Sequence, residues 1–184
     1  MYEEFRARAE AAGATVHRFF QADEALEFVL QQLAGEGVAP LPGLRAVLAP
    51  GALLEGWVGE ALKARVPGLE LEVTRELARE ARVGITRMDW GIADTATLVQ
   101  DSTPVEQRLA SSLPWTHIAL LSTGSLVPDL ATLLTRVDPE RSAYLAFITG
   151  PSRTADIERV LAIGVHGPER LVIVCIDALA EVAP

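Results

Sequence analysis

Short apolar runs alternate with segments of helical periodicity along this chain, and this alternation constrains its fold more than any other feature. In the first half, we expect strands over residues 14–20, 46–49, 69–73 and 83–86. Between them, apolar side chains spaced three or four residues apart predict helices over 23–35, 54–62 and 76–81. This repeated alternation of strand and helix, βαβαβ and onward, is typical of a parallel sheet with crossover helices. The sequence therefore predicts the α/β class with a mostly parallel sheet.

The second half continues the pattern after one interruption. Residues 91–99 lack a helical period and predict a tight turn that feeds a strand, whereas residues 109–114 predict irregular structure. Further elements are expected at a helix over 130–137 and strands over 118–121, 144–148 and 171–176, the last of which closes the sheet. The length of 184 residues fits one domain, 1–184, with residues 1–13 as an N-terminal helix packed on it or extending from it.

The acidic charge balance argues against two classes of partner. With a formal charge of −9, the chain has no basic stripe to neutralise a phosphate backbone, so we expect no nucleic-acid partner. An acidic lipid surface would repel the chain, and no apolar run has the length needed to cross a bilayer. The first six residues form no charged-then-apolar signal, so we expect no membrane association and a cytoplasmic location.

Cysteine content limits cofactor chemistry. Cys175 is the only cysteine and lies within the apolar run 171–176, which predicts an inert core position. A single cysteine forms no disulfide within the chain and cannot supply a four-cysteine zinc or iron–sulfur site. We therefore expect no metal site and no cofactor in this chain.

The segment from 144 to 168 predicts an anion site. A strand over 144–148 is followed by Gly150, and Ser152 or Thr154 can cap a helix whose apolar positions fall over 157–161. Free N–H groups at a helix start bind anions, and the neighbouring Arg153 adds a charge. The alternative is purely structural, because first-turn acids such as Asp156 and the capping hydroxyls also satisfy a helix start.

Three charged side chains are candidates for direct roles. The guanidinium fork of Arg153 matches a carboxylate or phosphate at two points, although a surface salt bridge is the alternative. Asp94, beside Thr95, is a candidate general base or ligand-orienting group, or it holds turn amides. His166 lies between glycines and is a candidate acid/base group, although a histidine in a turn can simply be packed or solvated. We expect the loops of Gly150, Asp94 and His166 to meet beyond the carboxyl ends of the strands.

The remaining histidines and tryptophans are given structural roles. His17 and His117 lie at or within predicted strands without a chemical constellation. The tryptophans at 57, 90 and 115 are expected in the core or at interfaces, and only Trp90 is a candidate to line a pocket.

Three segments together resemble one family. They are residues 91–98 (GIADTATL), Arg108 with 112–114 (SLP), and residues 148–158 (ITGPSRTADIE) with 164–168 (GVHGP). In this order they resemble LUD-domain proteins of the lactate utilization protein C type, by motif over the C-terminal half and by size and element order over the whole length. The resemblance implies a three-layer αβα sandwich like that of sugar-phosphate isomerases and CoA transferases (the NagB/RpiA/CoA transferase-like fold). Ligand-binding roles are expected for Gly150, Ser152, Arg153, Thr154, Asp156, Thr95 and Arg108, and catalytic roles for Asp94 and His166.

The resemblance also implies a function. It implies a subunit of a system that oxidises L-lactate to pyruvate with iron–sulfur partner proteins, whose clusters must lie in the partners. The family usually has glutamate and glycine where this chain has Asp94 and Ala96, which shortens the carboxylate and stiffens the turn. Two alternatives remain open: a stand-alone enzyme on a phosphorylated or CoA-linked metabolite, and a non-catalytic ligand-sensing module. The ligand expected is a small carboxylate or phosphate, and a homo-oligomer is possible.

Overall fold

A six-stranded parallel sheet forms the centre of the protein in a computed structural model that describes residues 1–52, 54, 57–138, 140–154, 162–163 and 166–179. Every adjacent pair of its strands is parallel. In spatial order the strands are β1 (Thr15–Phe19), β12 (Arg170–Ile176), β7 (Thr116–Ser122), β4 (Ala81–Met88), β2 (Arg45–Leu48) and β3 (Leu69–Glu70). The predicted α/β class with a mostly parallel sheet is confirmed.

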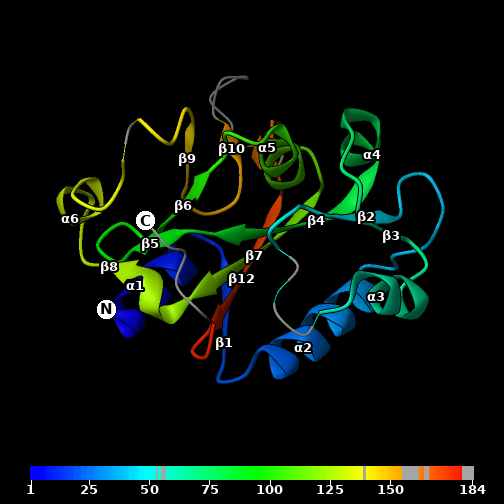
Figure 1. Ribbon diagram of the computed structural model, residues 1–184, viewed down its shortest axis with the longest axis horizontal. Helices are drawn as coiled ribbons and strands as arrows, with labels where there is room; N and C mark the ends of the chain where they lie inside the picture. Colours follow the sequence, from blue (N-terminus) through cyan, green and yellow to red (C-terminus); the bar gives the residue numbers. More distant parts are fainter. Residues whose placement is uncertain (53, 55–56, 139, 155–161, 164–165, 180–184) are drawn as a thin grey trace.

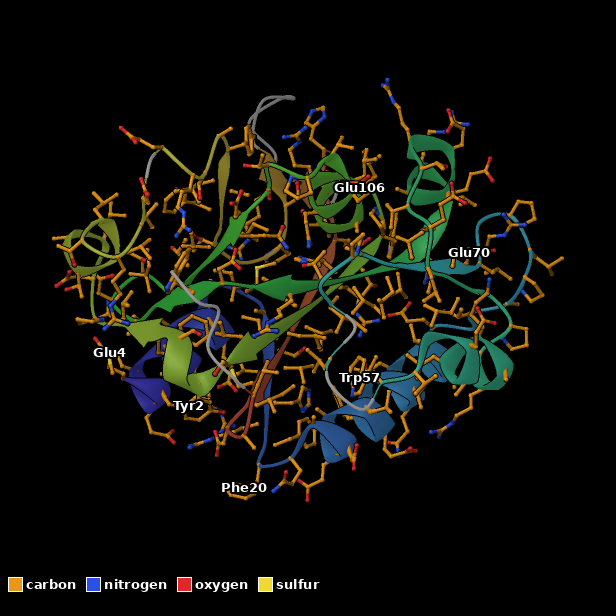
Figure 2. All side chains as sticks on the ribbon, viewed as in Figure 1. Tyr2, Glu4, Phe20, Trp57, Glu70 and Glu106 are labelled. Atoms are coloured by element: carbon orange, nitrogen blue, oxygen red, sulfur yellow. The ribbon has the colours of Figure 1, made fainter. Side chains whose placement is uncertain are left out.

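Two helices cover one face of this main sheet, as Figure 1 shows: α2 (Ala22–Gly35) and α3 (Gly59–Arg65). A capping box between Gln21 and Glu24 begins α2, and its buried face then packs on the sheet. Trp57 belongs to the same core and lies between the sheet and α2 (Figure 2). The tryptophan predicted for the core at this position is therefore confirmed as buried.

The other face carries helices and a second sheet. Its helices are α1 (Tyr2–Ala11), α4 (Arg75–Arg79) and α5 (Val105–Ser112). The second sheet has the order β8 (Leu126–Val127), β5 (Trp90–Ile92), β6 (Thr97–Asp101) and β9 (Leu145–Ile148). The short helices η1 (Thr123–Ser125) and α6 (Leu130–Leu134) adjoin it. The third layer is thus part helix and part sheet, with α4 and α5 opposite α2 and α3 (Figure 1).

Two strand predictions are correct in position but wrong in partner. β12 does not close the main sheet, because it lies between β1 and β7. β9 does not continue the parallel pattern, because it pairs antiparallel with β6 in the second sheet. An apolar run predicts a buried strand but carries no information about its neighbour or direction, and those depend on contacts distant in sequence.

The irregular structure expected over 109–114 is wrong, because α5 extends through Ser112. The buried positions of this helix, Ala110 and Ser111, are small or polar, so they give little hydrophobic period. Glycine is required on the facing strand, since a Cβ on Gly84 of β4 would overlap the carbonyl oxygen of Ala110. The close approach of α5 to the sheet therefore depends on Gly84.

Cys175 is fully buried in β12, as predicted for a core residue. Burial raises the pKa of its thiol to about 12, so the nucleophilic thiolate is absent at neutral pH. Within the described ranges, no helix combines the length and apolarity that a membrane crossing needs.

Candidate functional site

A cleft of about 500 Å³ lies between β9, α5 and the amino ends of β7 and β12. Its polar lining residues are Arg108, Ser111, Ser112, His117, Tyr144, Thr149, Ser152, Arg153 and His166. The cleft therefore joins three of the predicted segments: the Gly150 loop, the Arg108 helix and the His166 loop. It lies at the amino ends of the strands, not the carboxyl ends that were predicted, because β9 belongs to the second sheet and leads the chain there.

The charge of the cleft is opposite to that of the chain. Arg108 and Arg153 line it together with His166, and among the described residues no Asp or Glu does so. The whole chain carries a formal charge of −9. A concentration of guanidinium groups without carboxylates in a low-dielectric cleft favours a small anion.

Gly150 is at the turn between β9 and the cleft wall. Its φ of +66° is in the left-handed region, and a Cβ there would lie 2.7 Å from the carbonyl oxygen of Ala12. Both facts require glycine at this position. The predicted tight turn after the strand is therefore present.

The helix predicted to follow Gly150 is wrong at residues 162–163, which form a strand, and residues 153–154 before it form another. β10 (Arg153–Thr154) pairs antiparallel with β11 (Ala162–Ile163), so these residues form the arms of a hairpin. The amide of Ser152 already donates to the carbonyl of Pro168 at 2.8 Å, and so it is not a free N–H group for an anion. Asp156 and the stretch 157–161 lie outside the described residues. The helical spacing of the apolar residues is a local signal, whereas strand pairing joins residues that are further apart: Arg153 pairs with Ile163 and Thr154 with Ala162.

Arg153 borders the cleft at the side of α1. Its guanidinium donates to the carbonyl of Ala12 and passes over Gly13, where a Cβ would lie 2.7 Å from Nη2. Among the described residues this partner is a backbone carbonyl and not the carboxylate of a surface salt bridge. This hydrogen bond uses one of the five N–H groups of the guanidinium.

Arg108 is held more firmly than Arg153. Its Nη1 donates to the carbonyl of Ser102 at 2.8 Å, and its guanidinium carbon lies 4.9 Å from the centroid of the Tyr144 ring. The helical spacing of α5 brings Ser111 and Ser112 to the same side, where both hydroxyls donate to the Arg108 carbonyl. The arginine is thus oriented before any ligand arrives.

His117, for which the sequence predicts only a structural role, lines the cleft from β7. Its side chain is 1% exposed, and its Nε2 lies 2.8 Å from Oγ1 of Thr86 on β4. Burial lowers its pKa to about 4, so the imidazole is neutral at neutral pH. Only the β4–β7 register brings these two residues together, and no local sequence signal could have shown it. His166, in contrast, is exposed at the cleft.

Asp94 lies in the turn between β5 and β6, outside the residues that line the cleft. Its Oδ1 is buried without a hydrogen-bond partner among the described residues, and its backbone is held by Arg8 and Pro128. A chain of hydroxyls nevertheless connects this turn to the cleft: Thr97 donates to Thr95 at 2.8 Å and lies 2.8 Å from Oγ1 of Thr149. The Asp94 turn therefore adjoins the cleft without its carboxylate reaching the lining.

Ala96, in the same turn, has a φ of +52°. This left-handed conformation favours glycine, which the resemblance gives as the usual residue at this position. The structure thus provides the physical reason for that preference.

A smaller cavity of about 180 Å³ lies at the carboxyl ends of β2 and β4. Gly51, Arg87, Asp89, Gln100, Asp101 and Gln107 line it. Burial raises the pKa of Asp89 to about 6, even though the carboxyl accepts a hydrogen bond from the amide of Asp101. No group of three or more metal-ligating side chains occurs in the part of the chain that the structure describes.

The chain belongs to the LUD-domain family, whose model matches residues 2–176. It is 43% identical over 115 residues to a lactate utilization protein C from an Exiguobacterium species, and 35% identical over 108 residues to one from Bacillus velezensis. These matches cover 59% and 55% of this chain and 50% and 45% of the relatives, so the chain spans about half the length of the curated relatives it matches. A DUF162 family protein from Deinococcus radiodurans has the same fold, with a TM-score of 0.63 over 95% of both chains at 17% identity. The family resemblance read from the motifs is therefore confirmed.

Proposed function

We propose that the chain acts in lactate utilization and binds a small carboxylate such as L-lactate or pyruvate in the cleft of Arg108 and Arg153. The names of its relatives support the pathway. The observation that carries the ligand class is the cleft itself, which is lined by two arginines and by no described carboxylate within an acidic chain.

In this proposal the carboxylate of the ligand binds the oriented Arg108, and hydroxyl groups such as that of Ser152 contact its remaining oxygens. Arg153 adds a second cationic contact. His166 is retained as the candidate acid/base group, because its imidazole is exposed at the cleft. Asp94 and Thr95 would act only through the hydroxyl chain to Thr149.

Oxidation of lactate to pyruvate releases two electrons and two protons. We propose that iron–sulfur clusters of partner proteins accept the electrons in the cytoplasm, with no cofactor held by this chain. A tagged copy expressed in cells growing on lactate should co-purify with cysteine-rich iron–sulfur proteins. Deletion of the gene should abolish growth on lactate as the sole carbon source, and unimpaired growth would contradict the proposal.

Calorimetric titration tests the ligand site directly. L-Lactate or pyruvate should bind the unmodified protein, and Arg108→Gln should weaken binding by about tenfold, the effect of losing one charge-assisted hydrogen bond. Arg153→Ala should also weaken it. Arg75→Gln is the matched control, because Arg75 is an exposed α4 arginine outside the lining of the cleft. Equal binding by all four proteins would remove the anion site.

One observation favours a second candidate, an enzyme that acts on a larger phosphorylated or CoA-linked metabolite. The cleft volume of about 500 Å³ falls in the range of pockets that hold drug-sized ligands, and it exceeds the needs of a three-carbon acid. Inorganic phosphate belongs in the same titration, because preference for phosphate over both carboxylates would favour this candidate.

A further inference from the structure

A second groove adjoins the cleft at the amino end of the main sheet. Its volume is about 410 Å³, and it runs between the end of α4 and the segment that enters β7. Ser112, His166 and Gly167 line both the groove and the cleft. A ligand that fills the cleft can therefore extend past these residues into the groove.

Trp115 is the aromatic side chain of the groove. It is 45% exposed, although its backbone is fixed, because its carbonyl accepts a hydrogen bond from the amide of Glu169 at 2.9 Å. The guanidinium carbon of Arg82 lies 5.6 Å from the centroid of its ring. A half-exposed indole on a fixed backbone is a stacking surface for a planar group.

A buried carboxylate holds Arg82 in place. The side chain of Glu36 is 6% exposed, and its Oε2 accepts a hydrogen bond from Nε of Arg82 at 3.0 Å. The other oxygen, Oε1, accepts from the hydroxyl of Thr116 at 3.2 Å and from Arg170. The wall behind Trp115 is therefore rigid, which lowers the entropic cost of binding against it.

The charges of the two hollows differ. The groove contains the carboxylate of Glu80 beside the cations of Arg79 and Arg82, whereas the described lining of the cleft has cations alone. A ligand that spans both would place its anionic end in the cleft and its planar end in the groove.

We propose that the cleft and the groove together bind one nucleotide-class ligand, with its ring on Trp115 and its phosphates beside Arg108 and Arg153. This inference rests on the anion site of the proposed function, because the same two arginines would bind the phosphates. Stacking on an exposed tryptophan and charge-assisted bonds to arginine are the two contacts that a nucleoside diphosphate requires.

Titration with ADP, inorganic pyrophosphate and adenosine separates the two contacts. ADP should bind at least about tenfold more tightly than pyrophosphate, the usual contribution of one stacked base, and adenosine should bind most weakly. Trp115→Ala should remove the advantage of ADP while leaving pyrophosphate affinity unchanged, and Trp115→Phe should restore part of it. Phe20→Ala is the matched control, because Phe20 is an exposed aromatic residue at the carboxyl end of β1.

The outcomes distinguish this inference from the proposed function. If lactate and pyrophosphate bind but Trp115→Ala leaves ADP affinity unchanged, the nucleotide site is wrong and the anion cleft stands. If neither lactate, pyruvate nor pyrophosphate binds, the anion cleft and the inference that rests on it are both wrong. If ADP binds in a manner that depends on Trp115 but lactate does not bind, the nucleotide site is supported and the cleft binds a substrate other than lactate.

Discussion

The two ends of the main sheet differ in charge and in the group that each one buries. At the amino end, the larger cleft has two arginines and a buried neutral histidine, His117. At the carboxyl end, the smaller cavity has two aspartates, one of them the partly buried Asp89, together with Arg87. Helix α5 borders both, since Gln107 lines the cavity and Arg108 lines the cleft.

The comparison shows how one cause produces opposite titration shifts. Desolvation disfavours the charged form, so burial lowers the pKa of His117 to about 4 and raises that of Asp89 to about 6. Ligands of open α/β sheets usually bind beyond the carboxyl ends of the parallel strands. In this protein the larger, cationic cleft lies at the opposite, amino end. Strand β9 belongs to the second sheet and leads the chain to the amino ends of the main strands, so the cleft lies there.

The largest effect is expected from Gly84→Ala, which would disturb both ends at once. The added methyl group would overlap the carbonyl oxygen of Ala110 and lie 2.8 Å from Cγ of Pro114, so α5 must move away from the sheet. We expect a loss of about 3 kcal/mol in the free energy of unfolding, at the upper end for overpacking. Urea denaturation measures it.

Gly35→Ala is the control for this change, because nothing lies within 4 Å of a Cβ at the end of α2. It should be neutral or stabilising by up to about 1 kcal/mol. A Gly84→Ala protein as stable as the unmodified chain would show that α5 does not depend on this close approach.

The next-largest effect is on the pH dependence of stability, to which Asp89 and His117 should contribute with opposite signs. The folded pKa of Asp89 is raised above its ordinary 3.8, so the folded state holds the proton more tightly and its stability falls as pH rises from about 4 to about 6. The folded pKa of His117 is lowered below 6.5, so its contribution is present above pH 6.5 and is lost as pH falls toward about 4. Each contribution is on the order of 2 to 3 kcal/mol, and in the unmodified protein they oppose each other.

Asp89→Asn and His117→Gln separate these contributions. Relative to the unmodified protein, the stability of Asp89→Asn should rise with pH between about 4 and 6, whereas that of His117→Gln should fall. Asparagine can still accept the hydrogen bond from the amide of Asp101, so the variant removes charge more than structure. Urea midpoints across this pH range test both signs, and parallel profiles for all three proteins would refute the assignment.

The elements of the main sheet could be predicted from sequence, but the site could not be predicted as fully. Runs such as 171–176 are apolar at every position, so burial and strand identity follow directly from them. The cleft depends instead on pairings that no local pattern encodes. The hairpin at Arg153 and the contact between Thr86 and His117 are two examples.

The candidate site residues differ in the same way, because some come from segments that the fold brings together and others do not. Gly150, Ser152, Arg153, Arg108 and His166 all line the cleft, because they come from motifs in segments that the fold brings together. Asp94 and Thr95 were grouped with them from their motif alone, yet the turn that contains them faces α1 and touches the cleft only through hydroxyls. Trp115 was identified as a core or interface residue, and only the shape of the groove indicates a ligand contact.

The smallest effect is expected from Thr97→Val, which tests whether the Asp94 turn matters to the cleft. Valine keeps the shape of this buried side chain but removes the hydroxyl that connects Thr95 to Thr149. Because Thr149 is exposed, water can replace its lost partner, and we expect a loss of about 0.5 to 1 kcal/mol in stability.

If the Asp94 turn influences the cleft, Thr97→Val should also bind lactate or pyrophosphate several-fold more weakly. The pKa of Asp89 should stay unchanged. Thr135→Val is the control, because its hydroxyl donates to the carbonyl of Thr132 on α6, outside the lining of the cleft. Carbon-detected NMR titration of Asp89 reports on the carboxyl end of the main sheet, and calorimetric titration with the anion reports on the cleft at the amino end. An affinity equal to that of the unmodified protein would limit the turn to a structural role, since the hydroxyl chain is the route by which Asp94 can influence the amino end.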